Sequence, residues 1–178
     1  MADLVLYSKK LNQGAGLNPE TTIGPLVSEE QQKRVMGYIE KGIEEGAEVL
    51  CGGNKPFDQG YFVSPTVFAD VNDEMTIAKE EIFGPVISAL PFNDIDEVIE
   101  RANKSQFGLA AGVWTENVKT AHYIASKVRA GTVWVNCYNV FDAASPFGGF
   151  KQSGLGREMG SYALNNYTEV KSVWINLN

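Results

Sequence analysis

Residues 85–136 read PVISALPFNDIDEVIERANKSQFGLAAGVWTENVKTAHYIASKVRAGTVWVN. The apolar runs at 85–90, 109–114 and 132–136 are typical of strands, and the first run predicts a buried one. Between them lie two helical patterns, each preceded by a capping residue, Asn93 or Asp94 in one case and Asn117 in the other. Strand–helix–strand–helix–strand at this spacing predicts an α/β fold with a mostly parallel sheet and flanking helices.

The preceding part of the chain contains one well-marked helix. Residues 28–31 read SEEQ, which fits a capping box in which Ser28 and Gln31 satisfy each other's backbone N–H groups. Val35, Ile39 and Ile43 then recur at four-residue spacing and predict a buried face, with Gly46 as the stop.

The other elements before residue 85 are less regular. Residues 1–12 fit either a short helix or a strand, whereas 48–51 predict a short strand. The runs 61–63 and 66–68 flank Pro65, which indicates an edge strand or a bent one. No linker interrupts the chain, so residues 1–178 are predicted to form a single domain.

Composition restricts the class of protein. The chain has 178 residues, of which 44% are hydrophobic and 21% charged, as in a soluble globular domain. Its net charge of -7 and lack of a basic run argue against nucleic acid as a partner. No apolar stretch approaches the length of a membrane span, and no secretory signal is visible. With only two cysteines, a reducing, cytoplasmic location is expected.

The sequence contains no catalytic motif that stands alone. Residues 154–160 are one residue too long for a GxGxxG fingerprint and do not follow a predicted strand. His122, the single histidine, lies on a predicted helix without a nucleophile motif to serve, and no ligand spacing for a metal is present. No catalytic residue and no metal site are therefore predicted.

Two loops have unusual sequences, and strand-end loops are where α/β proteins bind ligands. Residues 80–86 read EEIFGPV, and 145–154 read SPFGGFKQSG within a stretch, 141–160, that contains five of the 18 glycines. From the residues alone, a binding role and simple turn packing are equally good explanations.

These loops are two of four motifs that together resemble the NAD(P)-dependent aldehyde dehydrogenase superfamily. The four segments, in order, are EEIFGPV at 80–86, NKSQFGL at 103–109, GTVWVN at 131–136 and SPFGGFKQSG at 145–154, the last completed by GRE at 156–158. The similarity runs from about Leu17 to the last residue. It implies a partial catalytic domain, roughly the last third of such an oxidoreductase.

The resemblance also implies a reaction. In the family a cysteine in a G-Q-x-C context attacks an aldehyde, a hydride passes to the nicotinamide, and water releases a carboxylic acid. Neither Cys51 nor Cys137 has that context, so this chain alone is expected to be inactive. The alternatives are a non-catalytic truncated subunit that associates with full-length homologues and, less well matched, a related acyl-phosphate reductase.

Binding roles follow by resemblance as well. Glu81 would accept hydrogen bonds from the nicotinamide ribose of NAD or NADP, and Phe83 would pack near the ring. Gln31 either contacts the same ribose or only completes the capping box. Phe141 and Phe147 would line the aldehyde tunnel, with ordinary core packing as the alternative.

The C-terminal tail is expected to mediate assembly. Residues 168–175 alternate as a strand does, and in the family this strand joins an intersubunit sheet, which implies a homo-oligomer. A further implication is an ion pair between Arg157 and Glu169.

Overall fold

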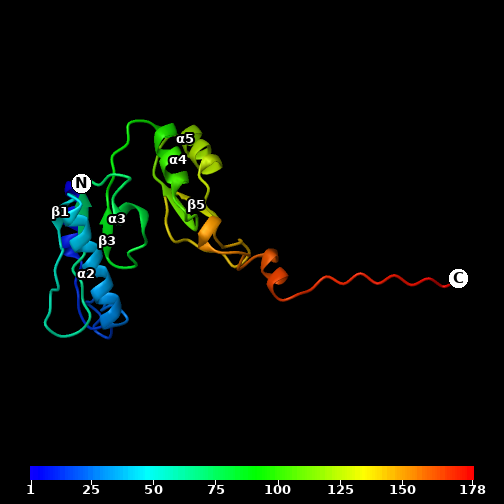
Figure 1. Ribbon diagram of the computed structural model, residues 1–178, viewed down its shortest axis with the longest axis horizontal. Helices are drawn as coiled ribbons and strands as arrows, with labels where there is room; N and C mark the ends of the chain where they lie inside the picture. Colours follow the sequence, from blue (N-terminus) through cyan, green and yellow to red (C-terminus); the bar gives the residue numbers. More distant parts are fainter. The chain divides into compact units, whose positions relative to one another are not determined.

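The computed structural model describes residues 1–178 as two compact units, Met1–Pro91 and Phe92–Asn178. Figure 1 labels several helices and strands of each unit. These residues were predicted to form one partial domain. Each unit has its own sheet and is described by itself.

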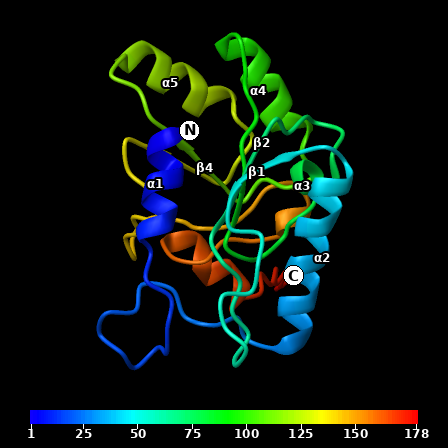
Figure 2. The same cartoon turned by 90° about the vertical axis from the view of Figure 1, so that its left-hand side faces the viewer.

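The first unit is a three-stranded sheet between helices. Its elements are α1 (Ala2–Lys10), α2 (Glu29–Glu44), β1 (Glu48–Cys51), β2 (Thr66–Ala69), α3 (Thr76–Lys79) and β3 (Val86–Ser88). The sheet order is β1-β2-β3, with β2 antiparallel to β1 and parallel to β3. Figure 2 shows α1 and α2 on opposite sides of β1 and β2. The ambiguous residues at the N-terminus thus form a helix.

Helix α2 contributes two fully buried side chains to the core of this unit. Its N-cap is Ser28, whose hydroxyl accepts from the Gln31 amide at 3.2 Å, and Gly46 follows the C-cap with a φ of +96°. Val35 and Ile39 are fully buried, as predicted. Ile43, however, is 52% exposed, because the buried face continues through Gly42 instead. That glycine lets the helix approach the sheet: a Cβ there would lie 3.1 Å from Cζ of Phe68 on β2.

Three strand predictions for this unit were wrong in detail. Residues 61–63 form no strand, and Thr66–Ala69 is the central strand rather than an edge strand. Pro65 is compatible with this because it precedes the ladder, where its missing N–H removes no sheet hydrogen bond. The strand predicted as buried, β3, is half-buried, and its Ile87 is 44% exposed. Within this sheet β3 is an edge strand.

The second unit contains a parallel strand pair. Its elements are α4 (Ile95–Lys104), β4 (Ala110–Val113), α5 (Val118–Lys127), β5 (Thr132–Val135) and two 3-10 helices, η1 (Lys151–Ser153) and η2 (Ser161–Asn166). Strands β4 and β5 are parallel and are joined through α5, which is a βαβ unit. Asp94 and Asn117 cap α4 and α5, as predicted. The α/β class with mostly parallel pairing is confirmed, although β3 pairs with β2 rather than with β4.

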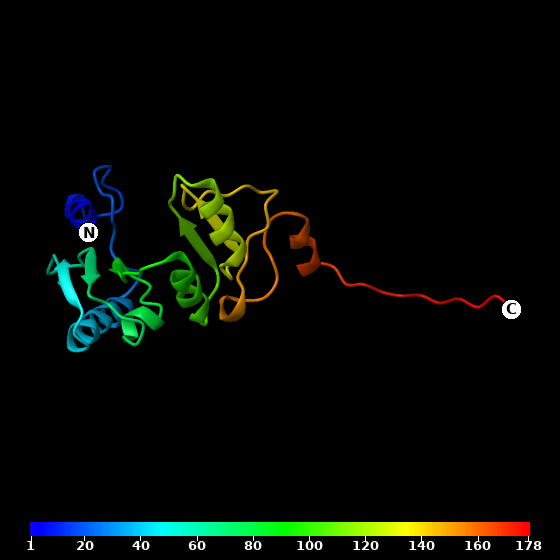
Figure 3. The same cartoon turned by 90° about the horizontal axis from the view of Figure 1, so that it is seen from above.

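The C-terminal residues form no strand within the chain. Residues 168–178 are extended in Figure 3, and Val170 and Trp174 are fully or almost fully exposed. A strand requires a hydrogen-bonded neighbour, so the predicted intersubunit strand stays a prediction for a second chain. The Arg157–Glu169 ion pair was wrong for this chain: Glu169 is exposed, and the Arg157 guanidinium donates to the carbonyls of Gly149 and Gly156 at 3.0 and 2.6 Å. No helix is long and apolar enough to span a membrane.

Candidate functional site

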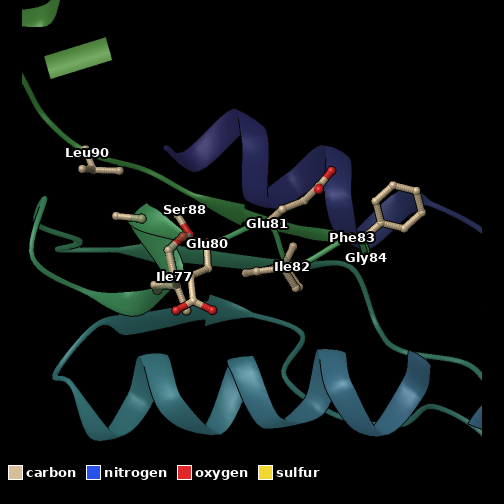
Figure 4. A pocket seen from close by; sticks show the side chains of 10 residues that line it. Ile77, Glu80, Glu81, Ile82, Phe83, Gly84, Ser88 and Leu90 are labelled. Atoms are coloured by element: carbon tan, nitrogen blue, oxygen red, sulfur yellow. Dashed lines mark hydrogen bonds between the residues drawn. The ribbon is translucent and has the colours of Figure 1, made fainter. Parts of the chain in front are cut away.

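The EEIFGPV segment, residues 80–86, connects α3 to β3 and borders an open pocket. The pocket has a volume of about 360 Å³ and is lined by Ile77, Ala78, the residues from Glu80 to Gly84, Val86, Ser88 and Leu90. Figure 4 shows this segment between the helices α1 and α2. A loop that leads into a strand at the rim of a pocket is a common position for ligand-binding groups.

The two adjacent carboxylates of this segment have different surroundings. The Tyr38 hydroxyl of α2 donates a hydrogen bond to Oε2 of Glu80 at 2.8 Å. Glu81 is exposed and makes no hydrogen bond or ion pair within the chain. In Figure 4 the Glu80 side chain points towards α2 and the Glu81 side chain points away from it. Both acceptor oxygens of Glu81 are therefore available to an external donor.

Gln31 does not complete the capping box in the predicted way. Its backbone N–H is capped by Ser28, but its side-chain amide Nε2 donates to the Phe83 carbonyl at 2.9 Å and to the Ile82 carbonyl at 3.5 Å. The first of these is a good hydrogen bond and the second is marginal. Gln31 thus links the first turn of α2 to a loop 52 residues further along the chain.

Phe83 has an unusual backbone and side-chain position. Its φ is +51°, a conformation that bulky residues rarely adopt, and its ring is 74% exposed. The next residue must be small, because a Cβ on Gly84 would lie 2.6 Å from Cγ2 of the buried Val35. The turn therefore packs closely on α2 while presenting the Phe83 ring outward.

These groups fit the ribose and nicotinamide end of a dinucleotide. An exposed carboxylate without an internal partner suits two vicinal hydroxyl donors, and a free aromatic face suits a planar ring. Within residues 1–178, no three His, Cys, Asp or Glu side chains lie together in a way that could hold a metal ion.

A second pocket lies in the second unit. Its volume is about 320 Å³, and its mostly apolar lining is formed by Thr132, Val133, Trp134, Cys137, Val140, Phe141, Asp142, Ser145, Pro146 and Phe147. Phe141 and Phe147 are in edge-to-face contact, with ring centroids 5.1 Å apart, and Trp134 packs edge-on against Phe141 at 5.6 Å. Phe141 is 46% exposed in this chain.

The two cysteines occupy different environments. Cys137 is exposed and lines this aromatic pocket. Cys51 is half-buried on β1, with its Sγ 3.8 Å from the Pro65 carbonyl oxygen, and it does not line the pocket of Glu81. Both are free thiols.

Sequence reasoning missed Tyr38 and Trp134. Tyr38 follows Gln31 by seven residues, which puts both on one side of a helix, so the spacing was available as a signal once the partner loop was known. Trp134 was recognised only as a strand residue, and its packing against Phe141 depends on how the 137–147 loop folds back.

The chain is similar over nearly its whole length to known proteins. A sequence model described as "Aldehyde dehydrogenase family" matches residues 1–173, starting earlier than the motifs had indicated. A putative aldehyde dehydrogenase, DhaS, of Bacillus subtilis is 71% identical over 175 residues, which are 98% of this chain and 35% of that protein. The mitochondrial aldehyde dehydrogenase of Homo sapiens is 56% identical over 171 residues, 96% of this chain and 33% of that protein.

Solved structures agree with the sequence comparison. An NAD⁺ complex of the aldehyde dehydrogenase from Bacillus cereus superposes with a TM-score of 0.95 at 62% identity, covering 99% of this chain and 36% of that one. A Mycobacterium tuberculosis aldehyde dehydrogenase complexed with NAD⁺ has a TM-score of 0.93 at 47% identity. This chain spans about a third of the length of the relatives it matches.

Proposed function

The chain belongs to the aldehyde dehydrogenase family, and we propose that it forms the part of an NAD(P)-dependent catalytic domain that holds the nicotinamide ribose and one wall of the aldehyde entrance. Both compact units belong to that one domain in this proposal. The observation that carries it is the unpartnered, exposed Glu81 carboxylate beside the exposed Phe83 ring, in a turn fastened to α2.

Each residue has a defined task in this proposal. Glu81 accepts hydrogen bonds from the ribose hydroxyls, Phe83 covers one side of the nicotinamide, and Gln31 contacts the same ribose or fixes the turn beside it. The dinucleotide, when bound, supplies the hydride acceptor. Phe141 and Phe147 form an apolar wall that favours the hydrocarbon part of an aldehyde.

The 178 residues are proposed to be inactive by themselves. They contain no cysteine in a G-Q-x-C context, and Cys51 does not line the pocket of Glu81. Holding a nucleophile and its partner in reactive geometry contributes about 7–11 kcal/mol to lowering a barrier. A chain without such a nucleophile in place has no route to that contribution.

A chimera tests this proposal. In it, this chain replaces the corresponding third of the Bacillus cereus enzyme to which it is 62% identical, and NADH formation is followed with a short aliphatic aldehyde. We expect turnover by the chimera, none by the 178-residue chain, and a large rise in KM for NAD⁺ in the chimera carrying Glu81→Gln. Turnover by the chain alone that disappears in Cys137→Ser would overturn the proposed inactivity.

A second candidate function is that of an accessory subunit that associates with full-length homologues. The observation that favours it is the extended tail, whose side chains Val170, Val173, Trp174 and Ile175 are all at least 71% exposed. Light scattering of the chain mixed with a full-length relative separates the two functions. A stable hetero-oligomer that disappears on removing residues 168–178 supports the subunit.

Two free thiols support a reducing, cytoplasmic location for either function.

A further inference from the structure

Helix α2 holds the EEIFGPV turn at two points that lie on either side of Glu81. Gln31 donates to the Phe83 carbonyl at 2.9 Å, and Tyr38 donates to the Glu80 carboxylate at 2.8 Å. Gln31 and Tyr38 are seven residues apart, which is two helical turns, so they lie on the same side of α2.

A third contact lies between these two hydrogen bonds. Val35 stands between Gln31 and Tyr38 on the same side of the helix, and it is fully buried. Its methyl groups face Gly84 so closely that a Cβ at that position would lie 2.6 Å from one of them. The helix therefore contacts the turn at Glu80, Phe83 and Gly84, whereas the Glu81 side chain makes no contact with it through a hydrogen bond.

From this arrangement we propose that Tyr38 is a positioning residue for the nicotinamide-ribose site: its hydrogen bond removes Glu80 from competition and fixes the direction of Glu81. Gln31 does the same on the other side of Glu81 through the Phe83 carbonyl. This inference rests on the proposed function, since it assigns a role in the same site. Without the Tyr38 hydroxyl, two adjacent carboxylates would be free to exchange places at the pocket rim.

The location of the two hydrogen bonds argues for positioning rather than for fold stability. Glu80 is exposed, and Gln31 and Tyr38 are half-buried. The Tyr38 ring packs against the core of this unit, but Tyr38→Phe keeps that ring, and the hydroxyl that it removes bonds to the exposed Glu80. Hydrogen bonds open to solvent contribute only a small part of the free energy of folding, because water replaces the lost partner, although each is enough to favour one local conformation over another. Their effect is to select one conformation of the turn.

The test uses the chimeric enzyme with Tyr38→Phe, which deletes only the hydroxyl. We expect KM for NAD⁺ to rise about three- to tenfold with kcat within about twofold, the size of one hydrogen bond expressed in binding. Tyr7→Phe is the matched control, because Tyr7 lies in the same unit, is 65% exposed and has no hydrogen-bond partner within the chain.

Two further variants separate a hydrogen bond from a charge effect. Glu80→Gln keeps an acceptor oxygen for Tyr38 and should raise KM less than Tyr38→Phe does. Glu80→Leu removes the acceptor together with the competing carboxylate, so its KM should not exceed that of Tyr38→Phe. The two losses should not add in the double variant Tyr38→Phe/Glu80→Leu, because they remove the same contact.

The outcomes distinguish this inference from the proposed function. A parent chimera that forms no NADH overturns the proposed function and, with it, the inference. An active chimera in which Tyr38→Phe and Tyr7→Phe have the same KM for NAD⁺ overturns the inference alone. So does an active chimera in which Tyr38→Phe lowers kcat as strongly as it raises KM, since that pattern indicates general disruption.

Discussion

Replacing Gly84 by alanine tests how closely the EEIFGPV turn packs on α2. The new Cβ would lie 2.6 and 2.9 Å from the two methyl groups of Val35, whereas carbon atoms in contact prefer about 3.5–4.0 Å. Val35 is fully buried and β-branched, so it has little freedom to rotate away. Overpacking of this kind costs about 1–3 kcal/mol.

Urea unfolding of the 178-residue chain, followed by far-UV circular dichroism, measures this cost. With a denaturant dependence of about 1–3 kcal/mol/M, the midpoint should fall by roughly 1 M. Gly37→Ala is the matched control, because Gly37 lies on α2 and nothing lies within 4 Å of a Cβ placed there. That variant should gain about 0.5–1 kcal/mol from reduced backbone freedom in the unfolded chain.

Gly84→Ala is expected to lower the free energy of unfolding, whereas Gly37→Ala is expected to raise it. If Gly84→Ala unfolds at the same urea concentration as the parent or at a higher one, the turn does not rest on Val35. The double variant Val35→Ala/Gly84→Ala provides a second check, because removing both methyl groups makes room for the new one. Its destabilisation should be smaller than the sum of the two single effects.

Three other substitutions and titrations are expected to have defined results. Hydrogen bonds from the Thr76 hydroxyl and then from its amide lower the pKa of Glu45 below its ordinary 4.5. The stability that they provide is present above pH 4.5 and is lost as the pH falls through the lower pKa of the folded state. Glu45→Gln should therefore reduce the pH dependence of stability in acid unfolding followed by circular dichroism. Gly131→Ala should disorder the glycine-rich loop, because its Cβ would collide with the Gly148 carbonyl oxygen, and limited proteolysis should then cut that loop faster. A hydrogen bond to the Asp96 carboxylate of α4 raises the pKa of Tyr123. The stability that this bond provides should be lost as the pH rises through the raised value, and Tyr123→Phe should remove that pH dependence from alkaline unfolding followed by circular dichroism.

Features set by neighbouring residues were predictable from the sequence. The caps of α2, α4 and α5 were each identified by a Ser, Asp or Asn whose side chain binds an N–H two or three residues later. The strands β1, β4 and β5 were also located to within two residues, because short apolar runs between turn residues leave few alternatives.

Features set by distant residues were not predictable in the same way. Ile43 continued the apolar stripe of α2, but the buried face follows Gly42, which depends on the position of Phe68. Gln31 fitted a capping box as an acceptor, and only the fold reveals that its side-chain N–H donates to the Phe83 carbonyl instead. The spacing of nearby residues predicts which hydrogen bonds a side chain is able to make. The partner that it actually bonds to depends on how the whole unit packs.

The backbone of Phe83 shows why the turn needs such partners. A left-handed φ costs an L-residue with a bulky side chain roughly 1–2 kcal/mol. One hydrogen bond returns about 0.5–1.5 kcal/mol, so the bond from Gln31 alone only about balances that cost. Two further contacts make this conformation the favoured one. They are the Tyr38–Glu80 hydrogen bond and the packing of Gly84 against the methyl groups of Val35 on α2. The direction of Glu81 is therefore a property of α2 as much as of the turn that carries it, because a strained residue keeps its conformation only where its surroundings determine it several times over.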